Sequence, residues 1–203
     1  MKLALSCDAH YYSQFMSTEQ SQALFEWLKS NFDLTEPEKL KMPNGEEVCI
    51  LPWRMIFVSP EFDNNDVFSE HHGRRAPWFP LLEQLRQQIK DCTGIEFSVG
   101  VCLYYPDGEE YMGFHTDLPA FGSTDVIASI SLGAEREFLI REQNNPEIQQ
   151  SVTLGDGSLL VMGNGFQDQY EHAVAKGSKE TGPRFNISFR QFKWAESTTK
   201  ANC

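Results

Sequence analysis

The sequence predicts an α+β fold in which two N-terminal helices support a sandwich or barrel of short strands. Two segments before Gly94 carry apolar residues at helical spacing. After Gly94 the pattern changes to short runs of alternating apolar and polar residues separated by turn residues. Helices followed by many strands indicate an α+β architecture, and 203 residues suit a single domain with a sizeable core.

The first helix is expected over residues 17–31, where Ser17 or Thr18 can cap the N-terminus. Residues 34–48 are interpreted as a polar connection with a turn at Asn44-Gly45. The β-branched and aromatic residues of 47–59 predict a strand that is interrupted at Pro52. A long polar loop follows over residues 61–77, and loops of this length are often functional.

The second helix is expected over residues 78–94, with Gly94 as its stop signal. The strands that we expect after it cover residues 97–105, 125–133, 136–142, 150–163 and 184–192. The tail over residues 195–203 is expected to be disordered.

Charge, cysteine content and apolar runs restrict the class of protein. The formal charge of −12 argues against broad attraction to a polyphosphate, although 71–75 and 176–193 hold enough basic residues for a local patch. The five cysteines form no C-x-x-C pair, which argues against a thiolate zinc site and a disulfide framework. The chain lacks the roughly 20-residue apolar run of a membrane span and a signal-peptide core. We therefore expect a cytoplasmic protein, with a monomer as the default.

The stretch GFHTDLPAFG places His115 and Asp117 two residues apart, at the end of a strand-like run. Side chains at i and i+2 of a strand point to the same side, so both can face one ion. Two histidines and one carboxylate suit a ferrous centre that keeps open positions, and His172 is the third candidate. The alternative is a polar turn in which Asp117 bonds the backbone. Residue chemistry alone leaves both interpretations open.

The segment RFNISFR, residues 184–190, alternates polar and apolar side chains. Alternation places its polar residues on one face, namely Arg184, Asn186, Ser188 and Arg190. A half-exposed strand explains this pattern. It also suits a face that binds a dicarboxylate, because two guanidinium groups can each make paired hydrogen bonds to a carboxylate.

Four ordered pieces together resemble a known family: YYPDGEEYMGFHTD, VIASISLGAEREFLIR, GDGSLLVMGNGFQDQYEHAV and RFNISFRQF. The chain resembles the AlkB-like Fe(II)/2-oxoglutarate-dependent dioxygenases over residues 97–192, about half its length. The resemblance implies a double-stranded β-helix (jelly-roll) core over 97–192 within a single domain, 1–203. It also implies that 1–96 supplies N-terminal helices and a substrate lid, and that 193–203 is a tail.

By position, the resemblance makes His115, Asp117 and His172 the iron ligands. It implies that the residues contacting 2-oxoglutarate are Tyr105, Arg184, Asn186 and Arg190. Arg190 would pair with the distal carboxylate, and Arg184 would lie near the metal-binding end. Such enzymes couple the oxidative decarboxylation of 2-oxoglutarate by O2 to hydroxylation of a C–H bond. A hydroxylated N-methyl group is a hemiaminal, which loses formaldehyde.

Two positions depart from the pattern of the family's base-repair enzymes. Leu103 stands where an asparagine that contacts the cosubstrate is common. Leu118 and Pro119 stand where further acidic residues that contact the base are common. These departures concern the substrate and not the class of enzyme.

A nucleobase substrate needs aromatic or apolar side chains for stacking. The substrate-side candidates are Trp53, Arg54, Phe57 and Tyr111, with Arg74 and Arg75 as phosphate contacts. Core packing is the alternative for the two aromatic residues of 47–59, and a solvated loop is the alternative for the arginine pair.

Three hypotheses follow for function. The first is oxidative demethylation of N-alkylated bases in DNA or RNA, with alkylated nucleic acid as the partner. The second is the same chemistry on a protein side chain or small molecule, which suits the acidic composition. The third, ranked well below both, is a jelly-roll binding module without catalysis.

Overall fold

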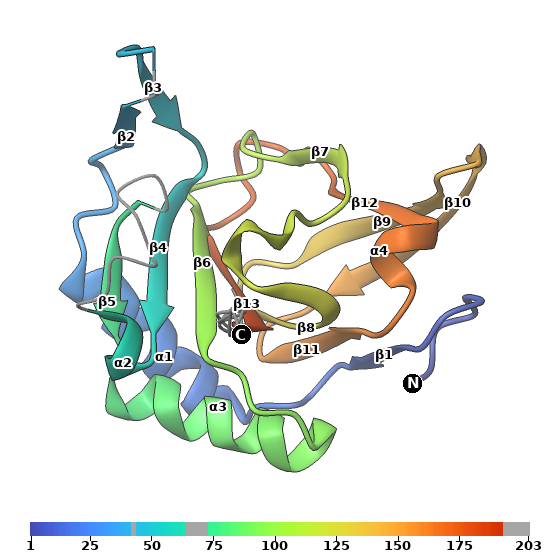
Figure 1. Cartoon of the computed structure of the whole chain (residues 1–203), viewed down its shortest axis with the longest axis horizontal. Coiled ribbons are helices and arrows are strands. Elements are labelled where there is room, and N and C mark those ends of the chain that lie inside the picture. The colour runs from blue at the N-terminus through green and yellow to red at the C-terminus, as the bar shows by residue number, and fades with distance from the viewer. Residues whose placement is uncertain (42–43, 64–72, 193–203) are drawn as a thin grey trace, which may run out of the picture.

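Two facing β-sheets form the centre of the protein, as seen in a computed structural model that describes residues 1–41, 44–63 and 73–192 (Figure 1). In spatial order, the seven-stranded sheet contains β1 (Ala9–Tyr12), β11 (Ser158–Met162), β8 (Ser123–Gly133), β13 (Arg184–Gln191), β6 (Val99–Tyr105), β4 (Trp53–Val58) and β5 (Arg75–Pro77). The four-stranded sheet contains β10 (Asn145–Leu154), β9 (Arg136–Glu142), β12 (Tyr170–Val174) and β7 (Met112–His115). This two-sheet core confirms the α+β prediction.

The two long helices, α1 (Thr18–Asn31) and α3 (Pro80–Thr93), lie beside the large sheet on the side away from the small sheet (Figure 1). Ser17 and Gln20 form a capping box at the start of α1, and α3 ends at Gly94, as expected from the sequence. The apolar faces of both helices share one core cluster with the apolar face of β13, which consists of Phe185, Ile187 and Phe189. The polar face of β13 is therefore directed toward the small sheet.

Residues 34–48 do not form the polar connection that we expected. They contain most of a hairpin of β2 (Glu38–Lys41) and β3 (Glu47–Ile50), which projects beyond the large sheet (Figure 1). The expected strand over 150–163 is two strands, because β10 ends at Leu154 and β11 begins at Ser158. β7 agrees with the strand-like run expected before Asp117. The short elements that the sequence did not indicate are β1, β5, β12, α2 (Pro60–Asp63), α4 (Phe166–Gln169) and the 3-10 turn Pro119–Phe121.

The expected tail over 195–203 lies outside the described residues, as do residues 64–72 of the expected polar loop. In the part of the chain that the structure describes, every helix is too short or too polar to cross a lipid bilayer.

Candidate active site

A cavity of about 670 Å³ opens between the two sheets and contains the candidate ligands of the sequence analysis. The large sheet contributes Asn186, Ser188 and Arg190 from β13, and Tyr105 from β6. The small sheet contributes His115 from β7 and His172 from β12. The chain after β3 contributes Leu51 and Pro52 to the mouth.

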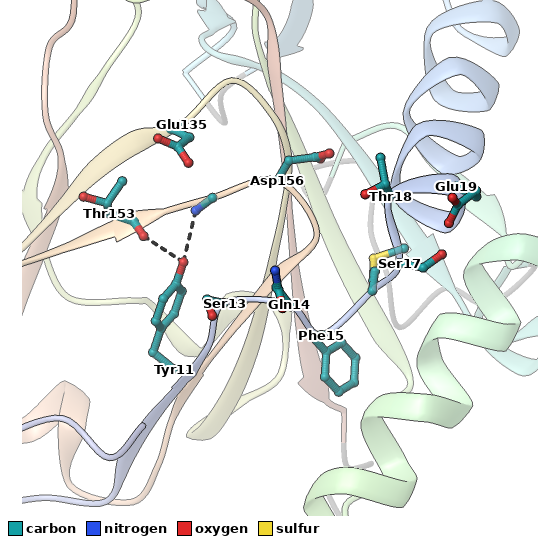
Figure 2. Close-up of a pocket in the computed structure, with 12 residues that line it drawn as sticks. Tyr11, Ser13, Gln14, Phe15, Ser17, Thr18, Glu19, Glu135, Thr153 and Asp156 are labelled. Carbon is teal, nitrogen blue, oxygen red and sulfur yellow. Dashed lines mark hydrogen bonds between the residues drawn. The ribbon is translucent and has the colours of Figure 1, made fainter.

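A larger hollow of about 900 Å³ lies elsewhere, between the start of α1 and the turns near Glu135 and Asp156 (Figure 2). The Tyr11 hydroxyl there donates to the carbonyl oxygen of Thr153 and accepts from the backbone N–H of Gly155. These hydrogen bonds connect β1 to the end of β10. The described residues around this hollow include no histidine or cysteine. The metal-ligating chemistry therefore lies in the smaller cavity.

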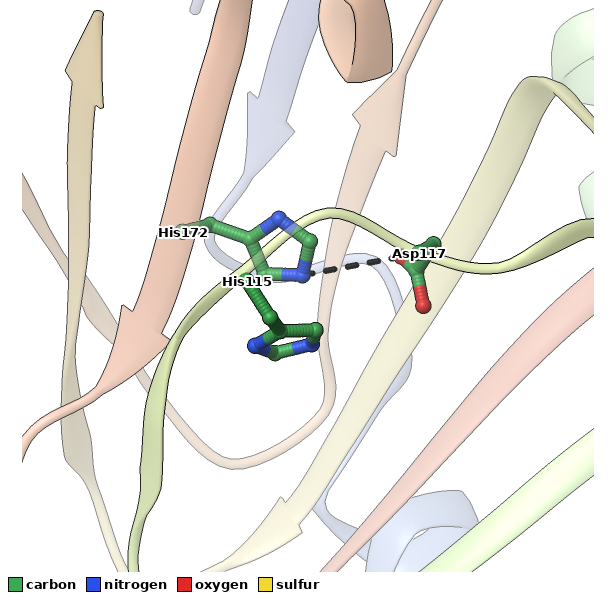
Figure 3. A group of neighbouring side chains, drawn as sticks. All are labelled: His115, Asp117 and His172. Atoms are coloured by element: carbon green, nitrogen blue, oxygen red, sulfur yellow. Dashed lines mark ion pairs between the residues drawn. The ribbon is translucent and has the colours of Figure 1, made fainter. Parts of the chain in front are cut away.

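Three side chains converge in that cavity (Figure 3). His115 and His172 are direct partners across the β7–β12 pairing, and Asp117 follows two residues after His115. One ligand atom from each of the three lies within 4.8 Å of the other two. Nε2 of His172 is 3.5 Å from Oδ2 of Asp117. This geometry is compatible with the interpretation of H-x-D as two of the three ligands of a metal site.

The chemistry of this donor set fits a divalent iron ion. Nδ1 of His115 donates to the carbonyl oxygen of Gly113 at 2.7 Å, which leaves Nε2 as the free ligand atom. Burial lowers the pKa of His172 to about 4, against the opposing attraction of Asp117, so this imidazole is neutral at pH 7. Two neutral imidazoles and one carboxylate are the donors that non-haem iron(II) oxygenases use.

Arg184 and Tyr105 form a second polar group, at the end of β13 where Arg184 pairs with Tyr105 across the strands. The Arg184 guanidinium is buried and lies 5.2 Å from the Tyr105 ring centre. Its Nη2 donates to Oγ of Ser131 at 2.9 Å, whereas Nε and Nη1 have no hydrogen-bond partner within the described part of the chain. Burial lowers the pKa of Arg184 to about 10, so the group stays charged at pH 7.

A buried cation with two unused donors fits a carboxylate that arrives with a ligand. Tyr105 lines the cavity, and burial raises the pKa of its phenol, which therefore keeps its proton for donation. Arg136 lies 5.6 Å from the same ring but already donates to the carbonyl oxygens of Glu110 and Ala175, at 2.7 and 2.6 Å. Of the two arginines beside Tyr105, Arg184 is the one whose guanidinium keeps donors without a partner among the described residues.

The two arginines of β13 lie at distances from the candidate metal ligands that differ from those that the resemblance implied. Arg190, expected at the distal carboxylate, contacts the carboxylate of Asp117 through Nη2. Arg184, expected near the metal, lies six residues away at the other end of β13, about 20 Å along an extended strand. Sequence order along the strand gave no information about which end lies at the metal.

The substrate-side candidates do not all reach the cavity. Arg54 lines it, whereas Trp53 and Phe57 are buried in the core at 4% and 0% exposure. Core packing, the alternative interpretation of these two aromatic residues, is what the structure shows. Tyr111 is exposed and lines a neighbouring hollow together with Leu51 and an acidic loop.

Of the basic residues that could supply a local patch, Lys176 and Lys179 are exposed, whereas the arginines are largely engaged within the fold. Arg184 and Arg190 are buried, so segment 176–193 does not present them to a phosphate backbone. Arg74 stacks on Trp53 and donates to the carbonyl oxygen of Glu36. Residues 71 and 72 and Lys193 lie outside the described residues.

Two residues near the cavity, Leu51 and Gln167, had no recognisable signal in the sequence. Leu51 and Leu118 lie at its mouth with 65% and 69% exposure, and Leu118 is one of the two departures from the expected acidic pattern. Gln167 of α4 bonds the main chain and side chain of Asp117. The link NGFQDQYE that contains it was visible in the sequence, but its contact with residue 117 depends on the fold.

Comparisons with known proteins give one family. Residues 8–190 match the model described as the 2OG-Fe(II) oxygenase superfamily. A relative from Arabidopsis thaliana, named DNA oxidative demethylase ALKBH2, is 28% identical over 209 residues, which cover 90% of this chain and 66% of that protein. The mouse alpha-ketoglutarate-dependent dioxygenase alkB homolog 3 is 34% identical over 122 residues, 56% of this chain and 43% of that protein. The chain thus spans less than two thirds of either relative.

Two further matches complete the comparison. The uncharacterized protein R406 of Acanthamoeba polyphaga mimivirus is 31% identical over 130 residues, 62% of this chain and 68% of that protein. A solved structure titled "The structure of OsALKBH1" superposes with a TM-score of 0.66 and 16% identity, over 94% of this chain and 100% of that one. At this identity the superposition supports the fold alone.

Proposed function

Because the chain belongs to the 2OG-Fe(II) oxygenase superfamily, we propose that it is an oxidative demethylase of N-alkylated bases in DNA or RNA. Iron(II) is the cofactor of this family, and 2-oxoglutarate and dioxygen are its cosubstrates. The observation that carries the proposal is the convergence of His115, Asp117 and His172 inside a cavity between two sheets. The expected AlkB-like resemblance is confirmed by the ALKBH2 and alkB homolog 3 relatives.

The polar groups that line the cavity, together with Arg184 buried beside Tyr105, have distinct roles in this proposal. His115, Asp117 and His172 hold iron(II), which when bound supplies the activation of dioxygen. Arg184 and Tyr105 bind the distal carboxylate of 2-oxoglutarate through the unused guanidinium donors and the phenol. Asn186 and Arg190, on the same face of β13, contact the end of the cosubstrate nearer the metal.

The overall reaction balances without any further reductant. One oxygen atom of O2 enters 2-oxoglutarate, which loses CO2 and becomes succinate. The other oxygen atom enters a C–H bond of the N-methyl group, and the hemiaminal then releases formaldehyde and the unmodified base. The apolar side chains around the polar groups, among them Val101, Leu103 and Met112, keep bulk water from the reacting atoms.

The mouth of the cavity suits an unpaired base more than a paired one. Leu51 and Leu118 offer apolar contact surface to a flat ring that has left its stack. The relative from Arabidopsis thaliana carries DNA oxidative demethylase as its name, which agrees with a nucleic-acid substrate.

A second candidate is the same chemistry on a protein side chain or a small molecule. The net charge of −12 favours it, as do Asp107, Glu109 and Glu110, which line the hollow beside the mouth. Carboxylates at this position repel a phosphate backbone.

Mass spectrometry of modified oligonucleotides separates the candidates. Single-stranded and duplex oligonucleotides that carry 1-methyladenine, 3-methylcytosine or an etheno adduct are incubated with the protein, Fe(II), 2-oxoglutarate and ascorbate in air. Loss of one methylene from a methylated base, with release of formaldehyde, is the expected result. It should be absent in His172→Ala and present in the matched control His10→Ala, which alters a histidine of β1 outside the cavity.

Succinate formed without any change in the oligonucleotides would reject a nucleic-acid substrate in favour of the second candidate. Absence of both succinate and demethylation, with iron bound, would reject the enzyme and leave a binding module.

A further inference from the structure

Gln167 contacts Asp117 through both atoms of its side-chain amide. Oε1 accepts a hydrogen bond from the backbone N–H of Asp117 at 2.8 Å. Nε2 lies 3.3 Å from Oδ2 of the same residue, to which it donates. A backbone N–H only donates and a carboxylate oxygen only accepts, so the two contacts fix which end of the amide is which.

Asp117 needs such a partner because it lies beyond the end of a strand. β7 ends at His115, and residues 116–118 make no ladder pairing with a neighbouring strand. The backbone N–H of a residue within a strand donates to a carbonyl oxygen of a neighbouring strand. The backbone N–H of Asp117 donates instead to the side chain of Gln167.

The carboxylate of Asp117 is held from two sides. Arg190 donates to Oδ1 through Nη2, and its Nη1 donates to the carbonyl oxygen of Leu118 at 2.7 Å. Gln167 donates to Oδ2. With one donor on each oxygen, rotation of the carboxylate about its Cβ–Cγ bond would break both hydrogen bonds.

Gln167 is itself held firmly by the short helix α4. Phe166, the preceding residue, is fully buried and its ring lies 5.9 Å from that of His172. Gly165 starts the helix with a φ of 83°, a conformation that favours glycine. Nε2 of Gln143 donates to the carbonyl oxygen of Gln167 at 2.9 Å. One short segment thus positions Gln167 against Asp117 and leads directly into the strand that carries His172.

We propose that Gln167 is a positioning residue of the metal site, which orients the carboxylate of Asp117 toward the ion that the two histidines bind. This inference rests on the metal site of the proposed function. An apolar side chain of equal length cannot replace the amide, because neither the N–H nor Oδ2 of Asp117 would keep its partner.

The test compares the same substitution at two glutamines of one helix. Gln167→Met keeps side-chain length but removes both contacts. Gln169→Met is the matched control, because Gln169 is exposed and its Oε1 accepts from Oγ of Ser6, not from a candidate ligand. Asp117→Ala is the reference for loss of a ligand. Mn²⁺ binding is measured by electron paramagnetic resonance, and the Co²⁺ absorption spectrum reports the ligand geometry.

Gln167→Met should bind Mn²⁺ on the order of 10–100-fold more weakly than the unmodified protein, as for other residues that orient metal ligands. Its Co²⁺ spectrum should change, whereas Gln169→Met should match the unmodified protein in both measurements. Thermal unfolding with a chelator present should show that all the variants are folded.

Mn²⁺ affinity and a Co²⁺ spectrum unchanged in Gln167→Met, with binding lost in Asp117→Ala, would overturn the inference. Absence of Mn²⁺ binding in the unmodified protein would overturn both this inference and the proposed function. A protein that binds metal and loses affinity on Gln167→Met, but converts no 2-oxoglutarate, would support the inference and reject the proposed function.

Discussion

Glu38 and Arg54 form an ion pair in which both side chains are largely buried. Their closest atoms are 2.9 Å apart, and the side chains are 3% and 11% exposed. Glu38 belongs to β2 of the projecting hairpin, and Arg54 belongs to β4 and lines the cavity. The same carboxylate accepts from the backbone N–H of Arg74. Glu38 therefore joins the hairpin, one wall of the cavity and the chain that enters β5.

Removal of this carboxylate should destabilise the protein. We expect Glu38→Ala to lower the free energy of unfolding by about 3 kcal/mol, because it removes a buried carboxylate that accepts hydrogen bonds from Nε of Arg54 and from the backbone N–H of Arg74. Urea unfolding measures the change. Glu36→Ala is the control, since Glu36 is exposed and uses only its backbone carbonyl to accept from Arg74. Equal stability of the two variants would contradict the assigned role of Glu38.

The two arginines of β13 should differ in what their loss affects. Arg184→Lys replaces a planar guanidinium, which can donate two parallel hydrogen bonds to a carboxylate, by a single ammonium group. This change should raise the KM for 2-oxoglutarate by roughly 30-fold, equivalent to about 2 kcal/mol. It should leave Mn²⁺ affinity unchanged. Arg190→Lys should weaken Mn²⁺ binding as well, because Arg190 contacts Asp117. Steady-state kinetics measure the KM for 2-oxoglutarate, and metal titration measures Mn²⁺ affinity. Weaker Mn²⁺ binding in Arg184→Lys, together with unchanged Mn²⁺ binding in Arg190→Lys, would favour the arginine positions that the sequence resemblance implied.

β13 shows what a sequence pattern predicts and what it omits. The alternation in RFNISFR predicted one polar face, which is confirmed because Phe185, Ile187 and Phe189 are fully buried in the core that contains the apolar faces of the helices. Alternation of polar and apolar residues along a strand determines only the face of the sheet to which each side chain points. The position of each arginine relative to the metal depends on β7 and β12, which belong to the other sheet.

The other failures also have tertiary causes. Trp53 and Phe57 are close in the chain to residues that line the cavity, but their own side chains pack in the core cluster that contains the helices. The hairpin over 38–50 is short and polar, and its place at the cavity comes from the buried contact of Glu38 with Arg54. Gln167 and Asp117 are separated by 50 residues, so no local pattern links them. The resemblance to AlkB-like enzymes succeeded because its motifs combine residue type, spacing and order.

The four cysteines in the described part of the chain should divide into two reactivity classes. Cys49 and Cys92 are exposed, whereas Cys7 and Cys102 are buried, and burial raises the pKa of both buried thiols. Thiolates are the reactive form. Treatment of the folded protein with iodoacetamide should therefore modify Cys49 and Cys92 and spare the buried pair, which should react after denaturation. Peptide mass mapping measures this, and rapid modification of Cys102 in the folded state would contradict the packing of β6.

The metal-free protein should lose stability as the pH falls from 6.5 toward 4. Burial lowers the pKa of His172 from 6.5 to about 4, so the unfolded chain binds this proton more readily than the folded chain does. The neutral imidazole therefore contributes stability that is fully present above pH 6.5 and is lost as the pH falls through the folded pKa. The loss assigned to this group is about 3 kcal/mol across that window.

The measurement is urea unfolding with a chelator at a series of pH values, for the unmodified protein and for His172→Gln. The variant keeps a polar side chain at the site but has no group that titrates there, so its stability should fall less between pH 6.5 and 4. His10→Gln, on β1, should retain the slope of the unmodified protein. Added Mn²⁺ should steepen the loss on acidification only when His172 is present, because the ion binds the neutral imidazole and competes with the proton. Parallel pH curves for the unmodified protein and His172→Gln would show that residue 172 is not the buried titrating group.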